Sequence, residues 1–341
     1  MKKKTFILIL ILATFAMLAG ACGNNSHSAN QANSSVQPSS SPLPSASTAQ
    51  EEAPVEIDNL GKKLTFSEAP KRPITLNQHA TEIMLALDLE SVMVGTAYLD
   101  DEILPELKEK YDAIPVLSEQ YPSKEVFLAA TPDFAYAGWK SAFEEKALGS
   151  RSELEQQGIL TYVQESSNIS SPTLEDVYQD ILNIGEIFRI EPRAQALVDS
   201  MDAQLKEIQA KIGQVDNPLK IFVYDSGEDK AFTAANTYLT DLINKVDAKN
   251  IFDDIDKGYT EVSWEEVVNR NPDVIVIIDY GDTTAEQKKQ LLLSQAALAN
   301  IKAIQDERFI IMPLSAAAEG IRAPIALKTL AEGLYPDKFN D

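Results

Sequence analysis

Cysteine and histidine, two side chains that often act in catalysis or bind metals, are scarce in this 341-residue chain. Cys22 is its only cysteine, and its two histidines are His27 and His79. The sequence contains no H-E-x-x-H zinc motif, no G-x-S-x-G nucleophile motif and no glycine loop for phosphate. A zinc or manganese site needs several nitrogen and oxygen ligands that converge. We therefore do not expect an enzyme, and a metal ion held by one histidine with carboxylates stays open as an alternative.

Two glutamates occupy the same place in a segment that the chain contains twice. Residues 123–137, SKEVFLAATPDFAYA, align without a gap with residues 263–277, SWEEVVNRNPDVIVI, about 140 residues further on. Each copy predicts a short helix capped by serine with Glu125 or Glu265 in its first turn, then a Pro-Asp turn and a buried strand. The helix dipole alone favours a glutamate at such a place. A matched pair indicates more, namely two related lobes that present two equivalent acidic points.

The first residues have the pattern of an exported protein. A basic region, an apolar run over residues 6–18 that is too short to span a membrane, and small residues precede Cys22. This order resembles a bacterial lipobox, which implies removal of a signal peptide, residues 1–21, and lipid on Cys22; a simple secretory signal with an incidental cysteine is the alternative. Residues 22–53 have little bulk to bury and much serine, asparagine and proline, so we expect a flexible tether.

The formal net charge of −22 restricts the possible partners. Acidity opposes docking on nucleic acid or anionic lipid, and no basic stripe or cluster of basic and aromatic residues predicts either. A multiply acylated cysteine would hold a protein firmly on a membrane. We therefore expect an extracytoplasmic protein that contacts the outer face of the cell membrane through its lipid anchor only.

The elements that must position these residues alternate between strands and helices. Residues 55–66 predict a hairpin, and short apolar runs bounded by turns predict strands on both sides of a long helical stretch. Apolar side chains recur at helical spacing from Ala194 to Ile212, and roughly 20 residues make a helix of about 30 Å. The sequence therefore predicts an α/β fold of two similar lobes with mostly parallel sheets, joined by one long α-helix. The expected parts are residues 54–170, the N-terminal lobe; residues 171–214, the connecting helical segment; and residues 215–341, the C-terminal lobe.

Taken in order, these segments resemble a class III substrate-binding protein of ABC importers. The resemblance is carried by the hairpin, PITLNQHATEIMLALDL (residues 73–89), the repeated segment, the long helix, FVYDSG (residues 222–227) and a terminal helix. It implies a monomer that captures an iron–siderophore complex, haem or cobalamin and delivers it to a permease dimer with ATPase subunits, with no cofactor of its own. A direct metal-ion receptor, an exported enzyme and an adhesin or sensor on the same fold are the alternatives.

The resemblance also implies roles for particular residues. One glutamate per lobe, here Glu125 and Glu265, would form salt bridges with arginines of the permease. The ligand would lie between the lobes, beyond the carboxyl ends of the parallel strands. Most of its expected contacts follow predicted strands, and Tyr259 stands where cobalamin binders of this type can carry an aromatic residue. The expected ligand contacts are His79, Tyr98, Trp139, Tyr224, Tyr259, Tyr280 and Arg322.

The sequence departs from its relatives at a few positions. Similar proteins usually have paired glycines where this chain has VDAKN, residues 246–250, and proline in place of Ala231 and Glu319. We expect these departures in loops near the cleft, where they bear on ligand identity. Because one long helix is stiffer than two or three flexible strands, we also expect little lobe closure and a largely preformed cleft.

Overall fold

The computed structural model describes residues 53–339, which belong to one compact unit, Glu51–Asp341. The expected signal peptide, Cys22 and nearly all of the expected tether lie outside the described residues. Among residues 53–339, no helix is both long and apolar enough to cross a membrane.

The N-terminal lobe is built on a parallel sheet of five strands within the described chain. In spatial order they are β5 (Val116–Ser118), β4 (Gly95–Ala97), β3 (Pro73–Leu76), β6 (Phe134–Ala137) and β7 (Leu160–Val163). An antiparallel hairpin of β1 (Val55–Asn59) and β2 (Lys62–Phe66) precedes this sheet. The helical elements, with η for 3₁₀ helices, are α1 (Gln78–Ala86), η1 (Pro105–Leu107), α2 (Lys108–Asp112), α3 (Lys124–Ala129), η2 (Lys140–Phe143) and α4 (Arg151–Gln156).

The C-terminal lobe repeats this plan on a smaller parallel sheet. In spatial order its strands are β10 (Ala248–Asn250), β8 (Leu219–Tyr224), β12 (Val274–Asp279) and β13 (Phe309–Pro313). A separate antiparallel pair consists of β9 (Ala231–Ala234) and β11 (Tyr259–Val262). The helical elements are α7 (Tyr238–Lys245), α8 (Trp264–Arg270), α9 (Ala285–Ser294), η3 (Ala296–Leu298), α10 (Lys302–Gln305), α11 (Leu314–Ala317), α12 (Ala323–Leu334) and α13 (Pro336–Phe339).

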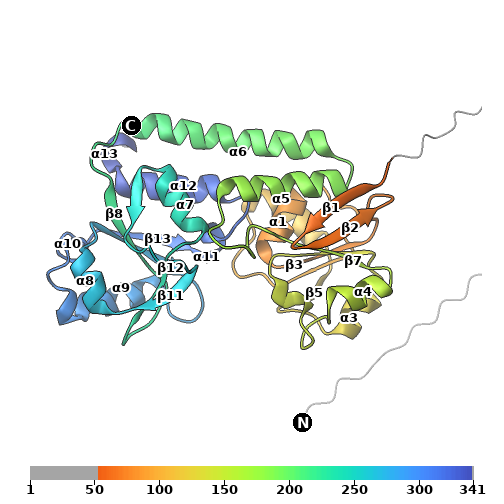
Figure 1. The fold of residues 1–341 in the computed structure, drawn as a ribbon, viewed down its shortest axis with the longest axis horizontal. Helices are drawn as coiled ribbons and strands as arrows, with labels where there is room; N and C mark the ends of the chain where they lie inside the picture. The colour runs from red at the N-terminus through yellow and green to blue at the C-terminus, as the bar shows by residue number, and fades with distance from the viewer. Residues whose placement is uncertain (1–52, 340–341) are drawn as a thin grey trace, which may run out of the picture. The chain divides into compact units, whose positions relative to one another are not determined.

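Two helices connect the sheets. Helix α5 (Leu174–Ile187) begins with a capping box on Thr173, and the predicted long helix is α6 (Glu191–Ile212). The buried residues of α6 form the stripe that the apolar spacing predicts. Helix α6 packs against both α5 and α12 (Figure 1). Helix α6 therefore contacts the helix that precedes it and a helix of the C-terminal lobe.

Hydrogen bonds fix α6 to both lobes. Near its start, the Arg193 guanidinium donates to the carbonyl of Leu87 at 2.6 Å, and near its end Gln209 donates to the carbonyl of Lys245 at 2.9 Å. A helix bonded at both ends is a stiff connection, because its own backbone bonds would have to break before it could bend sharply.

Both sheets have the strand order of a doubly wound fold. The chain starts on a central strand, builds toward one edge and then crosses to the other side. The direction reverses between β3 and β6 in the N-terminal lobe and between β8 and β12 in the C-terminal lobe. Ligands of open α/β sheets bind outside the carboxyl ends of the strands at such switch points. The predicted fold class is confirmed.

The repeated sequence segment forms the same structural unit in each sheet. Ser123 and Ser263 begin α3 and α8, and each side chain accepts a hydrogen bond from the backbone N–H three residues further on, at 3.3 and 3.2 Å. Asp133 and Asp273 each accept a bond from the backbone at the start of the neighbouring central strand, at 2.9 Å in both lobes. The strands that follow, β6 and β12, pair in parallel with β3 and β8.

One expected loop is a strand. Residues 246–250 contain β10, which pairs in parallel with β8 at the sheet edge. Asn250 is buried there and donates to the carbonyls of Ala234 and Ala235 at 2.8 and 3.0 Å. Asparagine is uncommon in strands, so propensity argued for a loop, but these bonds satisfy its amide and permit the strand.

Candidate ligand-binding site

A cavity of about 90 Å³ lies between the lobes, outside the carboxyl ends of their strands. Its wall combines residues that follow β3, β4 and β6 with residues that follow β13 and one residue of β11. The lining residues are Gln78, His79, Asp100, Trp139, Tyr259, Leu314, Ser315, Ala317, Ala318 and Glu319. Of the seven expected ligand contacts, His79, Trp139 and Tyr259 are among them.

This cavity is smaller than the largely preformed cleft that we expected. Pockets for drug-sized ligands usually have about 300–1,000 Å³. Bonds between the lobes close this one: Asp101 of the N-terminal lobe accepts from Ser315 of the C-terminal lobe at 2.8 Å. A bulky ligand therefore needs the lobes to separate before it can enter.

His79 is held as a neutral side chain in the cavity wall. It lies in the first turn of α1, just beyond β3, and is only 4% exposed. Burial lowers the pKa of His79 to about 4, because a charged imidazole would lose its hydration. Its neighbour Gly138 leaves room for the ring, since a Cβ at that position would lie 2.1 Å from Nε2 of His79.

Two aromatic rings complete the wall on opposite lobes. Trp139 follows β6, and its ring meets the His79 ring edge to face with the centroids 5.1 Å apart. Tyr259 belongs to β11, is 48% exposed, and stacks on Phe232 with the centroids 6.0 Å apart. These rings offer faces for a planar or positively charged ligand group.

Glu319 brings a buried carboxyl group to the cavity from the C-terminal lobe. Its Oε2 accepts a hydrogen bond from Ser167 of the N-terminal lobe at 3.0 Å, and the same hydroxyl oxygen lies 3.3 Å from Nε2 of His79. Burial raises the pKa of Glu319 to about 7. Asp100 also lines the cavity, and burial, with the neighbouring Asp101, raises its pKa too.

Arg322 does not line this cavity, because it bonds with N-terminal residues instead. Its Nε and Nη2 donate to the two carboxylate oxygens of buried Glu82 at 2.8 and 2.5 Å. Nη2 also donates to the carbonyl of Glu102 at 2.6 Å, and Nη1 to Ser315 at 2.9 Å. Arg322 thus forms a buried salt bridge between the lobes.

The other three expected contacts also lie outside the cavity lining. Tyr224 is buried and donates to the carbonyl of Gly227 at 2.8 Å, while Tyr280 donates to Asp225 at 2.7 Å. Burial raises the pKa of both phenols to about 12. The Tyr98 ring packs edge to face on another tyrosine ring, with the centroids 4.7 Å apart.

Most of the lining residues that the C-terminal lobe supplies were not predicted from the sequence. Leu314 to Glu319 follow β13, so the rule that placed ligand contacts after strands applied to them as well. Glu319 carried a second signal, since it was already noted as a departure from similar proteins. Ala231, another departure, is buried in β9 and does not line the cavity.

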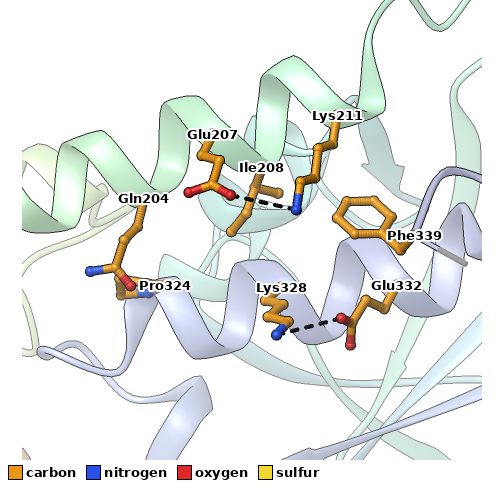
Figure 2. Close-up of a pocket in the computed structure, with 8 residues that line it drawn as sticks. All are labelled: Gln204, Glu207, Ile208, Lys211, Pro324, Lys328, Glu332 and Phe339. Atoms are coloured by element: carbon orange, nitrogen blue, oxygen red, sulfur yellow. Dashed lines mark ion pairs between the residues drawn. The ribbon is translucent and has the colours of Figure 1, made fainter. Parts of the chain in front are cut away.

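A larger hollow, of about 420 Å³, lies between α6 and α12 (Figure 2). Its charged residues pair within their own helices: Glu207 lies 3.4 Å from Lys211, and Glu332 lies 3.7 Å from Lys328. Exposed pairs of this kind are ordinary features of a helix surface. The hollow brings together no buried polar group that a ligand would satisfy, so the cavity between the lobes is the stronger candidate.

Glu125 and Glu265 lie on the surface of their lobes, in the first turns of α3 and α8. Neither carboxylate takes part in an ion pair in the described part of the chain. Hydrogen bonds from its own backbone N–H and from Ser123 lower the pKa of Glu125. Both groups are therefore free to meet a cation on another protein.

Within residues 53–339, no three or more histidine, cysteine, aspartate and glutamate side chains are placed to hold a metal ion together. His79 and Glu319 are not joined by a third such residue in ligand position. A metal ion bound here would need further ligand atoms from water or from a chelator.

The chain is similar to periplasmic binding proteins in both sequence and structure. The model of the periplasmic binding protein family matches residues 74–316. A structure of a periplasmic binding protein from Veillonella parvula is 33% identical, covers 83% of this chain and 98% of its own, and has a TM-score of 0.78.

Two curated relatives carry more specific descriptions. The uncharacterized ABC transporter substrate-binding lipoprotein YvrC of Bacillus subtilis is 28% identical over the whole of both chains. The molybdate-binding protein MolA of Haemophilus influenzae is 30% identical over 184 residues, which is 50% of this chain and 51% of that protein.

Proposed function

Since this chain belongs to the periplasmic binding protein family, we propose that it is the extracytoplasmic substrate-binding protein of an ABC importer. The observation that carries this proposal is the cavity between the lobes, where His79 and Trp139 of one lobe face Tyr259 and Glu319 of the other. A solute held there contacts both lobes at once, so binding changes how they sit together. A permease that contacts both lobes can then distinguish the ligand-bound protein from the empty one by this arrangement.

The proposed ligand is an iron–siderophore complex or a similar metal chelate, such as haem or cobalamin. The aromatic faces of Trp139 and Tyr259 and the neutral imidazole of His79 suit a chelate with large flat surfaces. Entry requires the bonds between the lobes to break. The alternative is direct capture of a metal ion, which the volume of about 90 Å³ favours.

The proposed partner is a permease dimer with its ATPase subunits, and the proposed contacts are Glu125 and Glu265. Both are exposed, unpaired with any described cation, and placed by the same structural unit in each lobe. Exposed ion pairs are individually worth about 1 kcal/mol or less, so these would set register and encounter rate more than affinity. We further propose that lipid on Cys22 holds the protein at the outer face of the membrane, as the lipoprotein pattern and the Bacillus subtilis relative support.

The test uses the two tryptophans as reporters. The mature chain, beginning at residue 22 and carrying Cys22→Ser so that no lipid is added, is titrated with ferric siderophores, haem, cobalamin, Mn²⁺ and Zn²⁺. Saturable quenching by a chelate that persists in Trp264→Phe and disappears in Trp139→Phe would support the proposal. Trp264 is the matched control because its indole donates to the carbonyl of Glu228 at 2.8 Å, outside the cavity. Quenching by metal ions alone would favour the alternative, and no response to any of them would contradict both.

A further inference from the structure

Glu319 is buried, and no cation pairs with it in the described part of the chain. Buried Glu82 has the guanidinium of Arg322. Buried Asp180 accepts hydrogen bonds from Tyr162 at 2.6 Å and from two backbone N–H groups at 2.9 Å. The partners of Glu319 are the hydroxyl of Ser167 and its own backbone N–H. A buried carboxylate normally has a cation or several donors, because isolated burial is costly.

The rest of the cavity wall is also suited to positive charge. Glu319 and Asp100 both line it, and the lining includes no lysine or arginine. The guanidinium of Arg322 is nearby but is already bonded to both oxygens of Glu82. His79 is neutral, so it adds no positive charge that would attract an anion.

The aromatic residues reinforce this preference. Cations are attracted to the faces of tryptophan and tyrosine rings, and the attraction grows when water is excluded. Trp139 and Tyr259 both border the cavity. By contrast, sites for phosphate-like or carboxylate ligands use arginine, lysine or converging backbone N–H groups.

We propose that the cavity selects a positively charged group of its ligand, and that Glu319 is the residue that determines this specificity. The inference rests on the proposed function and names the charge of its substrate class. The charged group is either a positively charged chelate, for example one with a pendant ammonium group, or a metal ion itself. Highly anionic solutes, such as a ferric tris-catecholate complex, citrate or molybdate, are poor ligands for this site.

A pair of probes that differ only in charge tests the proposal. Ferrioxamine B carries a free ammonium group, and its N-acetyl derivative has the same iron centre without that charge. The mature chain with Cys22→Ser is titrated with both, with ferric tris-catecholate and molybdate as anionic probes, and with Mn²⁺, Ni²⁺ and Zn²⁺ as free metal ions. We expect ferrioxamine B to bind about tenfold or more tightly than its N-acetyl derivative, and the anionic probes to bind least.

Variants assign this preference to Glu319. Glu319→Gln should reduce the difference between the charged and neutral probes to less than about twofold, whereas Glu319→Asp should keep it. Glu228→Gln is the matched control, because Glu228 is an exposed acid of the same lobe outside the cavity lining, and its removal should leave the difference unchanged. If Glu319→Gln does not fold, the native chain decides through salt, because a preference based on charge must weaken as ionic strength rises.

The outcomes separate this inference from the proposed function. Equal or tighter binding of the neutral or anionic chelates, or a preference that survives Glu319→Gln, would overturn the role of Glu319 and leave chelate capture standing. Binding of free metal ions alone, weakened by Glu319→Gln, would support the inference and identify the metal ion as the charged group. No binding by any probe would contradict both.

Discussion

The carboxyl ends of the central strands are used differently in the two lobes. In the N-terminal lobe, residues that follow β3 and β6 turn toward the cavity, and they include His79 and Trp139. In the C-terminal lobe, Tyr224 and Tyr280 stand at the equivalent ends of β8 and β12, yet both bond within their own lobe. That lobe reaches the cavity instead from the segment after β13 and from β11.

The repeated unit on the outer surface, by contrast, is alike in the two lobes. Its serine cap and the aspartate of its Pro-Asp turn have matching bonds in both lobes, and each copy carries its glutamate in the first turn of the helix. A partner that itself has two similar halves needs two equivalent contacts, whereas one ligand between two lobes needs complementary walls. Matching units on the surface and unlike walls in the cavity are what we expect if the repeated unit is the proposed docking surface and the cavity is the proposed ligand site.

The largest expected effect tests the two equivalent glutamates of the repeated unit. Replacing both Glu125 and Glu265 with alanine should abolish ligand uptake in cells while ligand affinity of the purified protein stays within about twofold. Each single change should reduce uptake by a similar factor, because the two contacts are equivalent. Uptake of radiolabelled ligand and a binding titration measure the two quantities.

The control for this pair removes the same charge elsewhere. Glu109 of α2 and Glu286 of α9 are also exposed glutamates in the first turn of a helix, one in each lobe. Uptake by Glu109→Ala with Glu286→Ala should be normal. Normal uptake by the Glu125 and Glu265 double variant would remove the docking assignment, and loss in both pairs would indicate a general effect of charge.

The sequence was sufficient for the fold but not for one half of the site. Hydrophobic spacing and the duplicated segment predicted two parallel sheets and α6. Buried faces of helices and strands require apolar residues at regular spacing, which a sequence shows directly. Of the residues that the prediction of ligand contacts placed after strands, His79 and Trp139 line the cavity. Tyr280 does not line it, because the direction of that side chain depends on its bond to Asp225, which no local pattern encodes.

Arg322 shows the same limit in another form. Its position near the C-terminal end, after a strand, favoured a ligand contact, and its partner Glu82 lies 240 residues earlier in the chain. A pair so distant in sequence becomes visible only when both lobes are packed together. A single sequence shows which side chains carry charge, but it does not show which charges are already neutralised by a partner.

The second prediction concerns this contact between the lobes. Arg322→Met should lower the free energy of unfolding by about 3–5 kcal/mol, because it leaves Glu82 buried without its cation. Adding Glu82→Gln should recover part of the loss, since the remaining group is then neutral. Urea unfolding followed by circular dichroism measures both.

A variant on the adjoining helix serves as the control for Arg322. Lys328 pairs with Glu332 on the surface of α12, with 65% and 48% of the side chains exposed. Lys328→Met should change the free energy of unfolding by about 0.5 kcal/mol or less. A similar loss in Arg322→Met and Lys328→Met would show that the contact between the lobes adds nothing beyond an exposed pair.

The third prediction concerns how stability depends on pH, because the pKa of Glu319 is raised and the pKa of His79 is lowered. Glu319, with its pKa raised to about 7, keeps its proton in the folded chain at pH values where the unfolded chain has lost it. Its contribution to stability therefore falls as pH rises from about 4.5 to 7, by about 3 kcal/mol. His79, with its pKa lowered to about 4, contributes stability that rises with pH up to about 6.5. The two contributions nearly cancel in the native protein.

Replacing Glu319 removes its contribution to the pH dependence of stability and leaves that of His79. In Glu319→Gln the fall is gone, so the free energy of unfolding relative to the native chain should increase by about 3 kcal/mol between pH 4.5 and 7. Urea unfolding of both proteins at pH 4.5, 5.5, 6.5 and 7.5 measures the difference directly. A difference that does not depend on pH would show that Glu319 keeps an ordinary pKa.

The smallest expected effect lies in a place where the repeated units themselves differ. Thr131 and Asn271 occupy equivalent positions before the Pro-Asp turn, and both have positive φ, 48° and 46°. Asparagine tolerates this left-handed conformation, whereas β-branched threonine is strained in it. Thr131→Asn should therefore raise the free energy of unfolding by about 0.5–1 kcal/mol.

The reverse exchange makes the comparison sharper. Asn271→Thr should lower stability by about 1–2 kcal/mol, because it introduces the strain and also removes the bond in which Asn271 Oδ1 accepts from the backbone of Lys302 at 3.0 Å. Thr131→Ala, which removes the β-branch but not the left-handed strain, should give a smaller gain than Thr131→Asn. If the two exchanges shift stability in the same direction, the backbone of the repeated unit is not equivalent in the two lobes. Opposite shifts would mean that the backbone at this turn has the same conformation in both lobes, and that Asn271 suits this conformation better than Thr131 does.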